Sequence, residues 1–237
     1  AALLQARRRF LADAAHQIRT PLAVLGTQAE YGGRQEDPEE MRRTFGSMLN
    51  SIRGTRHMAN QMLSLARAEQ VNGLVRERSR VDLAELALEV AGDFAVLAVN
   101  KSIDLAYDGP RSGAFVEGNG TMLREMISNV LDNALRYTPK GGHVILSLTP
   151  EPDQAILSVS DNRPGIPQAE VERVFQRFYR ILGTGDVEGS GLGLCIVREI
   201  VNAHGGSIHL APGIEDRGVS VHITLPCAPT HSSLKAD

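Results

Sequence analysis

Residues 9–22 read RFLADAAHQIRTPL and lie within a seven-residue repeat of apolar side chains. A helix that places apolar residues alternately three and four positions apart forms a coiled-coil seam. This spacing predicts a long amphipathic helix over residues 3–31. Its seam positions are Leu4, Leu11, Ala15, Ile18, Leu22, Leu25 and Ala29.

A second repeat with the same spacing predicts another helix over residues 38–68. Asp37 is suited to a helix N-cap and Pro38 to the first helical position. Two such helices form an antiparallel hairpin whose apolar faces are only half covered, so we expect two copies to pair into a four-helix bundle, a homodimer. The second seam contains Met41, Phe45, Met48, Ile52, Thr55, Ala59, Met62 and Ala66.

His16 lies outside the first seam, so its side chain is expected to face solvent. Thr20 follows one turn later on the same outer face. Pro21 lacks a backbone donor and should bend the helix beside His16. An imidazole in this setting is either an incidental surface residue or a reactive group.

The composition is that of an ordinary globular protein. Of the 237 residues, 42% are hydrophobic and 22% are charged, and the formal net charge is −3. No apolar run is long enough to span a bilayer. The slightly negative net charge argues against a protein that binds nucleic acid mainly through contacts with the phosphates. Cys195 and Cys227 show no metal-ligand spacing, which favours reduced thiols. The chain opens at Ala1 directly into the helical repeat, so we expect a fragment of a longer protein.

A different periodicity begins after a predicted linker at residues 69–80. Alternating segments typical of strands are interleaved with apolar helices, which predicts a two-layer α/β sandwich over residues 81–227. The whole chain is therefore expected to be α+β, with a hairpin at residues 1–68 and a disordered tail at 228–237. The predicted helices are 81–99, 121–137 and 195–203, and the predicted strands are 103–107, 114–117, 143–148, 155–160, 207–210 and 219–225.

Three polar residues of the second domain are candidates for binding a nucleotide. Asn129 and Asn133 lie one turn apart on a predicted helix, and their neutral amide oxygens suit a hydrated Mg²⁺ ion. Asp161 ends a predicted strand, where its carboxylate can accept a hydrogen bond from an amine such as that of adenine. The alternative for Asp161 is a simple turn over residues 161–165.

Glycines at positions 189, 191 and 193 precede an apolar helix. Backbone amides exposed by such a loop, together with a helix N-terminus, form a cradle for phosphate groups. The spacing matches neither the P-loop nor the dinucleotide fingerprint.

In this order, the segments resemble the boxes of sensor histidine kinases. Residues 9–22 resemble the H-box, the helix around Asn133 the N-box, residues 160–166 the G1 box, residues 174–180 the F-box and residues 188–194 the G2 box. The resemblance covers nearly the whole chain. It implies a catalytic domain of the superfamily that also contains DNA gyrase, heat-shock chaperones and mismatch-repair ATPases.

The resemblance implies that His16 accepts a phosphoryl group from ATP and passes it to an aspartate on the receiver domain of a response regulator. Thr20 matches the position that orients water when such kinases dephosphorylate their partner, so phosphatase activity is also expected. Gln17 and Arg19 flank this pair and complete the candidate catalytic set.

The resemblance also implies roles in the second domain. Asn133, helped by Asn129, would bind Mg²⁺, and Asp161 would hold the adenine amine. Residues 167–188 resemble the family's mobile lid, from which Arg177 or Arg180 would reach the γ-phosphate. The candidate nucleotide-binding residues are Asn129, Asn133, Arg136, Tyr137, Asp161, Gly165, Ile166, Arg177, Phe178, Arg180, Gly189, Gly191, Leu192, Gly193 and Leu194.

Two positions depart from the family pattern. Gln17 stands where many relatives carry an acidic proton acceptor, and an amide cannot take a proton. Arg163 replaces the usual first glycine of the G1 box. If that position requires a positive φ, the arginine is strained and nucleotide binding is weakened or lost, whereas otherwise its long side chain could swing over the mouth of the site.

Two alternatives to an active kinase therefore stay open. One is a catalytically impaired module that acts as a scaffold or phosphatase, and the other is an ATPase clamp of the same superfamily. By family analogy we expect the cytoplasmic part of an inner-membrane sensor, although a soluble sensor would leave the same fragment. Cys195 and the histidines at positions 143, 204, 209 and 222 are predicted to be packing or capping groups.

Overall fold

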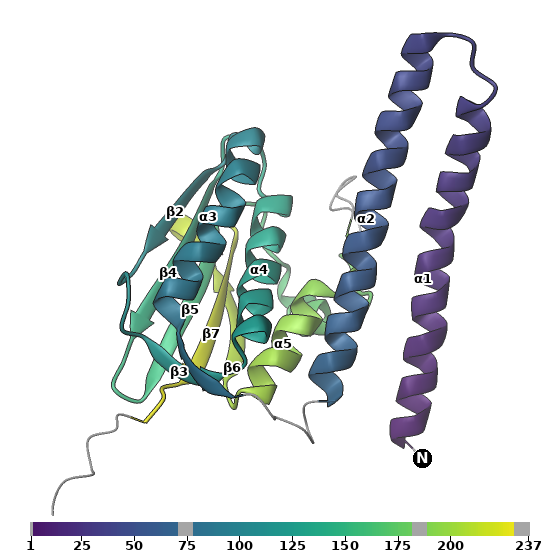
Figure 1. Cartoon of the computed structure of the whole chain (residues 1–237). Coiled ribbons are helices and arrows are strands. Elements are labelled where there is room, and N and C mark those ends of the chain that lie inside the picture. Colours follow the sequence, from purple (N-terminus) through teal and green to yellow (C-terminus); the bar gives the residue numbers. More distant parts are fainter. Residues whose placement is uncertain (1, 71–77, 182–188, 230–237) are drawn as a thin grey trace, which may run out of the picture. The chain divides into compact units, whose positions relative to one another are not determined.

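The computed structural model describes residues 2–70, 78–181 and 189–229, without the side chains of residues 2–13, 16, 17, 57 and 64–70 (Figure 1). The chain divides into two compact units, a helical hairpin and an α/β unit, and residues 189 and 190 are grouped with the hairpin. Each unit is described by itself.

The hairpin consists of α1 (Ala2–Gly32) and α2 (Pro38–Gln70). Asp37 caps α2, because its Oδ1 accepts a hydrogen bond from the Glu39 backbone N–H at 3.0 Å. The helices approach closely beside the turn, where a Cβ on Gly32 would lie 3.1 Å from Cγ2 of Thr44. The predicted antiparallel hairpin is confirmed, and α2 extends two residues beyond its predicted end.

Several apolar side chains of the hairpin are exposed in the single chain. Leu22 and Phe45, both at predicted seam positions, are each 54% exposed. Ala15, another predicted seam position, is also exposed in the single chain, whereas its neighbour Ala14 is buried. Coverage of the seam by a second copy stays a prediction. One residue rotates a helix by about 100°, so the repeat alone defines the direction of the apolar stripe only coarsely.

The α/β unit contains a five-stranded sheet in the order β2-β4-β5-β7-β6 and a separate two-stranded sheet, β1-β3. The β2–β4 pair is parallel, and the other neighbours in the larger sheet are antiparallel. Figure 1 shows α3, α4 and α5 together on one face of this sheet, which confirms the predicted two-layer sandwich. The elements are β1 (Ser79–Asp82), α3 (Leu83–Lys101), β2 (Asp104–Asp108), β3 (Phe115–Gly118), α4 (Gly120–Tyr137), β4 (His143–Pro150), β5 (Gln154–Asp161), α5 (Gly193–Ala203), β6 (Ser207–Pro212) and β7 (Val219–Pro226), with short 3₁₀ turns at Gln168–Glu170, Arg173–Phe175 and Ile214–Asp216.

The core of this unit lies between the sheet and the helices. Alternate residues of β4 and β5 are buried, as period-two strands with one covered face require. The facing stripe of α4 repeats at helical spacing and is almost fully buried. The core residues of these three elements include Leu123, Met126, Ile127, Val130, Leu131, Leu135, Val144, Leu146, Leu157 and Val159.

The structure differs from the predicted linker and tail. Strand β1 already begins at Ser79, and Asp82 caps α3 by accepting a hydrogen bond from the Ala84 N–H at 3.0 Å, so that helix starts two residues later than predicted. The Ala228 N–H donates to the Phe115 carbonyl at 2.8 Å, which places Ala228 against β3 rather than in a disordered tail. Residues 230–237 lie outside the described residues. No described helix combines the length and the apolar character needed to cross a membrane.

His204 is a buried packing residue, as predicted. Its Nε2 accepts a hydrogen bond from the Asn119 N–H at 3.1 Å, and its Nδ1 lies 2.7 Å from the Ile200 carbonyl. These partners assign the proton to Nδ1 of a neutral ring. Burial lowers the pKa of His204 from its ordinary value, because a charged ring would be desolvated.

This lowered pKa predicts an acid-sensitive stability. Below about pH 6.5 the unfolded chain protonates His204 while the native state does not, so the free energy of unfolding should fall as the pH decreases from 7.5 to 5.5. Urea unfolding at these pH values measures the fall. In His204→Gln the fall should be smaller, and an equal fall in both proteins would contradict the assignment.

Candidate active site

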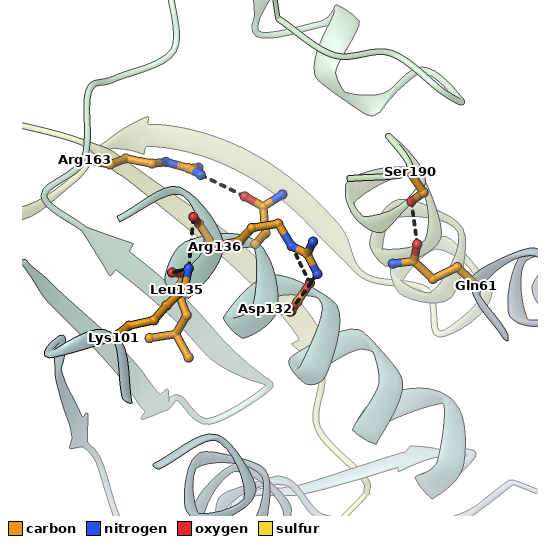
Figure 2. A network of polar contacts seen from close by, with 8 residues as sticks. Gln61, Lys101, Asp132, Leu135, Arg136, Arg163 and Ser190 are labelled. Atoms are coloured by element: carbon orange, nitrogen blue, oxygen red, sulfur yellow. Dashed lines mark hydrogen bonds and ion pairs between the residues drawn. The ribbon is translucent and has the colours of Figure 1, made fainter. Parts of the chain in front are cut away.

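Helix α4 presents the polar residues predicted for an N-box. Asn119 caps the helix by accepting a hydrogen bond from the Met122 N–H at 3.1 Å. At the other end, Lys101 Nζ donates to the carbonyls of Leu135 at 2.8 Å and Arg136 at 3.3 Å (Figure 2). Both ends of α4 are thereby anchored, which fixes the polar face between them.

The two predicted amides have different surroundings. Asn129 is buried, and its Nδ2 donates to the Glu125 carbonyl at 2.9 Å. Asn133 is half-buried, and its Oδ1 accepts a hydrogen bond from Arg163 Nη1 at 2.9 Å (Figure 2). Arg136 forms an ion pair at 3.0 Å with Asp132, which lies one helical turn earlier in α4.

Asp161 ends β5 and is 1% exposed. Its Oδ1 accepts hydrogen bonds from the backbone N–H groups of Arg163 and Val219, each at 3.1 Å. The turn before β7 packs directly on this strand end, since a Cβ on Gly218 would lie 2.0 Å from the Asp161 carbonyl oxygen. A Cβ on Gly213 would lie 2.1 Å from the same oxygen.

The sequence analysis did not identify Gly213, Gly218 and Val219 as parts of the site. Their signal is a pair of glycines that bracket a short turn ahead of the last strand. Gly218 has φ +77°, a conformation that glycine adopts without steric cost.

Arg163 lies between the two principal candidates for ligand binding. Its Nε is 3.1 Å from Oδ2 of Asp161, its Nη1 donates to Asn133, and its Cζ is 5.1 Å from the centre of the Tyr137 ring. Arg163 is not among the described residues with positive φ, so the condition for backbone strain at this position is not met. The side chain is only 7% exposed, so it lies inside the site and does not cover an open mouth.

Burial and the partner's charge shift the pKa values of Asp161 and Arg163 in opposite directions. Desolvation raises the pKa of Asp161, and the neighbouring Arg163 and the two backbone hydrogen bonds act in the opposite direction. Desolvation likewise lowers the pKa of Arg163, and Asp161 counteracts that effect. The ion pair therefore offsets part of the cost of burying both groups.

Two buried side-chain atoms among the described residues lack a hydrogen-bond partner, Arg163 Nε and Thr138 Oγ1. The Nε of Arg163 lies at ion-pair distance from Asp161 without the direction of a hydrogen bond. Thr138 directly follows α4. Buried polar atoms are normally satisfied, so unpartnered atoms here indicate a place for a ligand or water. The amide oxygens of α4, the buried carboxylate of Asp161 and the hydroxyl of Thr138 fit a purine nucleotide with Mg²⁺, provided that the Arg163 side chain moves away from them.

The predicted phosphate loop is closely packed in its described part. Gly191 has φ +69°, and a Cβ there would lie 2.6 Å from the Phe178 carbonyl carbon. Phe178 itself has φ +61°, and its N–H donates to the Gly191 carbonyl at 2.9 Å. Helix α5 begins at Gly193, so the amides of its first turn are available to an anion. Gly189 belongs to the other unit.

The other predicted nucleotide-binding residues are more scattered. Leu192 and Leu194 bury their side chains, which leaves only their backbone for a ligand. Arg177 is half-buried and interacts with the thiol of Cys195, whose pKa burial raises. The remaining three are exposed or half-buried: Gly165, Ile166 and Arg180. Residues 182–188 of the predicted lid lie outside the described residues.

The predicted phospho-acceptor lies within α1, which is helical through Pro21. Arg19 and Thr20 are exposed, as expected for the outer face. The side chains of His16 and Gln17 are not among those described, so the predicted exposure of the imidazole stays a prediction.

Two family models match the chain. Residues 6–71 match the His Kinase A (phospho-acceptor) domain. Residues 118–229 match the histidine kinase-, DNA gyrase B-, and HSP90-like ATPase. The first match contains His16, and the second contains Asn129, Asn133, Asp161 and the glycine loop.

Curated relatives match nearly the whole chain. The sensor protein kinase PmrB of Pseudomonas aeruginosa is 41% identical over 223 residues, which are 94% of this chain and 46% of that protein. The signal transduction histidine-protein kinase/phosphatase MprB of Mycobacterium sp. strain KMS is 35% identical over 233 residues, 93% of this chain and 44% of that protein. The chain thus spans about half the length of the curated relatives it matches.

Solved structures of histidine kinases also match the chain. A mycobacterial sensor histidine kinase MprB structure is 33% identical, with a TM-score of 0.56, and the match covers 65% of this chain and 100% of that one. The histidine kinase ThkA in complex with the response regulator protein TrrA has the same fold, with 22% identity, a TM-score of 0.72 and coverage of 97% of this chain and 64% of that one. The chain therefore belongs to the sensor histidine kinases of two-component systems, with a phospho-acceptor hairpin followed by the ATPase domain of that family.

Proposed function

We propose that this chain transfers the γ-phosphoryl group of ATP to His16 and then to an aspartate of a response regulator. The observation that carries the proposal is that Asn133 and Asp161 meet at one arginine, in the unit that also contains the start of α5, in a chain whose hairpin matches a phospho-acceptor domain. An amide, a carboxylate and helix-terminal amides are the groups needed for a cation, a base and phosphates, respectively.

In the first step a bond forms between an imidazole nitrogen of His16 and the γ-phosphorus, while the bond to the ADP oxygen breaks. A neutral imidazole provides the lone pair, and its proton is then lost to water because Gln17 cannot accept it. The phosphohistidine next gives its phosphoryl group to the carboxylate of the partner. The protein mainly aligns these groups and neutralises charge.

The α/β unit would hold the nucleotide. Asp161 would accept the hydrogen bond of the adenine amine, and the amides of Gly191 and Gly193 would face the phosphates. Asn129 and Asn133 would hold Mg²⁺ through their oxygens, and the ion would offset the phosphate charge when bound. Arg177 and Arg180 remain the two candidates for contacting the γ-phosphate.

A homodimer and a response-regulator partner are part of the same proposal. The exposed Leu22, Phe45 and Ile52 support pairing of two hairpins, because apolar side chains of this size gain free energy when a second copy covers them. Two relatives support the partner and a phosphatase activity: the histidine kinase ThkA was solved in complex with a response regulator protein, and MprB is named a kinase/phosphatase.

Incubation of the intact chain with γ-labelled ATP and Mg²⁺ tests the proposal. A kinase should acquire label that is labile to acid and stable to alkali, as expected for a phosphohistidine. An ATPase clamp would bind nucleotide without acquiring label, and an impaired scaffold would bind no nucleotide. Either of these outcomes would contradict the proposal.

Thr20 provides a separate prediction for the phosphatase reaction. Thr20→Ala should slow dephosphorylation of the response regulator about 10-fold or more, because a hydroxyl that orients water is lost. Autophosphorylation should stay near the wild-type rate, since Thr20 belongs to the hairpin and the residues proposed to hold the nucleotide belong to the α/β unit. The two rates are measured with the purified partner, and Thr27→Ala, also an exposed threonine of α1, is the matched control. Equal phosphatase rates for both variants would contradict the assignment.

A further inference from the structure

We propose that Arg163 closes the nucleotide site in the nucleotide-free chain, so that a purine nucleotide with its metal ion must displace the arginine to bind. The inference rests on the proposed function, because it takes Asn133 and Asp161 as nucleotide-binding residues. It assigns to Arg163 the role of an internal competitor that sets the apparent affinity of the kinase for its nucleotide.

The first argument is that Arg163 already occupies both partners. Its Nη1 donates to Asn133 Oδ1 at 2.9 Å, so this oxygen faces a cationic group of the chain itself. Its Nε lies 3.1 Å from Asp161 Oδ2, while Oδ1 of the same carboxylate accepts two backbone hydrogen bonds. A metal ion at Asn133 and a base amine at Asp161 would each meet the guanidinium.

The second argument is burial. Asp161 is 1% exposed, and the arginine that pairs with it is 7% exposed. A base cannot contact the carboxylate while this arrangement persists. The guanidinium also lies near Tyr137, another candidate nucleotide-binding residue, with Cζ 5.1 Å from the ring centre.

The third argument is that the closed arrangement is incompletely bonded. Arg163 Nε lacks a hydrogen bond, and so does the buried hydroxyl of Thr138 next to α4. A buried ion pair gains net stability only when its remaining donors and acceptors are satisfied. The contacts with Asn133 and Asp161 keep the arginine in the site, and the missing hydrogen bond of its Nε lowers the free-energy cost of its displacement by a ligand. Its long side chain can carry the guanidinium to water while the backbone N–H groups of Arg163 and Val219 keep their hydrogen bonds to Asp161.

The consequence for affinity follows from the population of the open state. A ligand that binds only the open state has its dissociation constant raised by the reciprocal of that state's population. If the open state makes up about one tenth of the molecules, removing the guanidinium should tighten nucleotide binding about 10-fold.

The test compares the dissociation constants of ADP and ATP with Mg²⁺ for the wild type and Arg163→Met by calorimetry on the intact chain. Methionine keeps an unbranched side chain and removes the charge and the donors. We expect binding about 10-fold tighter in Arg163→Met. Arg124→Met is the matched control, because Arg124 lies on the surface of α4, where it forms ion pairs with Glu89 and Asp93 of α3. The nucleotide affinity of this variant should equal that of the wild type.

A second measurement on the wild type does not depend on the variant folding. Arginine Nε–H signals in ¹⁵N-resolved NMR report hydrogen exchange, and the Arg163 signal should be protected without nucleotide and lose its protection when ADP and Mg²⁺ are added. A purely structural arginine would stay protected in both states.

The outcomes separate this inference from the proposed function. Equal or weaker nucleotide binding by folded Arg163→Met, or an Arg163 signal that stays protected with nucleotide bound, would overturn the inference and leave the kinase assignment intact. Absence of nucleotide binding in the wild type and in Arg163→Met would overturn both.

Discussion

Replacement of His16 by glutamine is expected to reduce phosphate uptake from ATP at least about 10³-fold. The imidazole nitrogen is the proposed nucleophile, and a glutamine amide of similar size has no comparable lone pair. The helix should persist, because residue 16 lies outside the predicted seam and glutamine is a good helix former. The initial rate of labelling from γ-labelled ATP measures the effect.

His57→Gln is the matched control, since His57 lies in the other helix of the same hairpin. It should be labelled at the wild-type rate, and both variants should bind nucleotide like the wild type. Persistent labelling of His16→Gln together with loss of labelling in His57→Gln would move the phospho-acceptor to α2.

Asp161→Ala should have the second largest effect, on nucleotide binding and on stability together. Loss of the carboxylate removes the proposed partner of the base amine, and binding of ATP should weaken about 100-fold, since hydrogen bonds to charged groups contribute up to about 3 kcal/mol. This loss outweighs the release of Arg163, which affects binding only about 10-fold. Calorimetric titration below the unfolding temperature measures the binding.

The same substitution removes the counter-ion of Arg163, whose guanidinium can then move to water. The backbone N–H groups of Arg163 and Val219 lose their acceptor, and an unsatisfied buried donor costs about 1–3 kcal/mol, so the free energy of unfolding should fall by about that amount. Asp93→Ala, which removes an exposed partner of Arg124, should change neither quantity appreciably. Wild-type affinity for ATP in Asp161→Ala would contradict the proposed base contact.

The sequence was sufficient to predict the architecture, because the decisive patterns are local. The three-four repeat and the Asp37-Pro38 start define the hairpin, and the alternation in β4, β5 and β7 defines the sheet. Strand β1 was missed because four residues, Ser79–Asp82, are too few to show a period, and its pairing with β3 is set by residues more than thirty positions away.

The candidate site could be predicted as a set of residues but not as a set of contacts. Whether Arg163 is strained depends on how the turn at Gly213 and Gly218 packs on Asp161, and that contact joins segments about fifty residues apart. The sequence likewise gave no sign that the arginine would bond to Asn133 across thirty positions. Non-local hydrogen bonds of this kind follow from the tertiary fold, which places the ends of α4 and β5 together.

The arrangement at Arg163 also explains how a departure from the family pattern can be compatible with the family's activity. A bulky residue at a position of ordinary φ causes no backbone strain, and its charge is balanced by the carboxylate that the site already contains. The expected consequence is a weaker apparent affinity for the nucleotide, with the chemistry of transfer unchanged.

The central claim is that a nucleotide held by the α/β unit phosphorylates the imidazole of His16. Mass spectrometric mapping of the intact wild-type chain after incubation with ATP and Mg²⁺, under neutral conditions that preserve phosphohistidine, tests it most directly. We expect one phosphoryl group in the peptide containing His16, located on the imidazole. Phosphate confined to another histidine or to a hydroxyl side chain, or no phosphate in a chain that binds ATP, would contradict it.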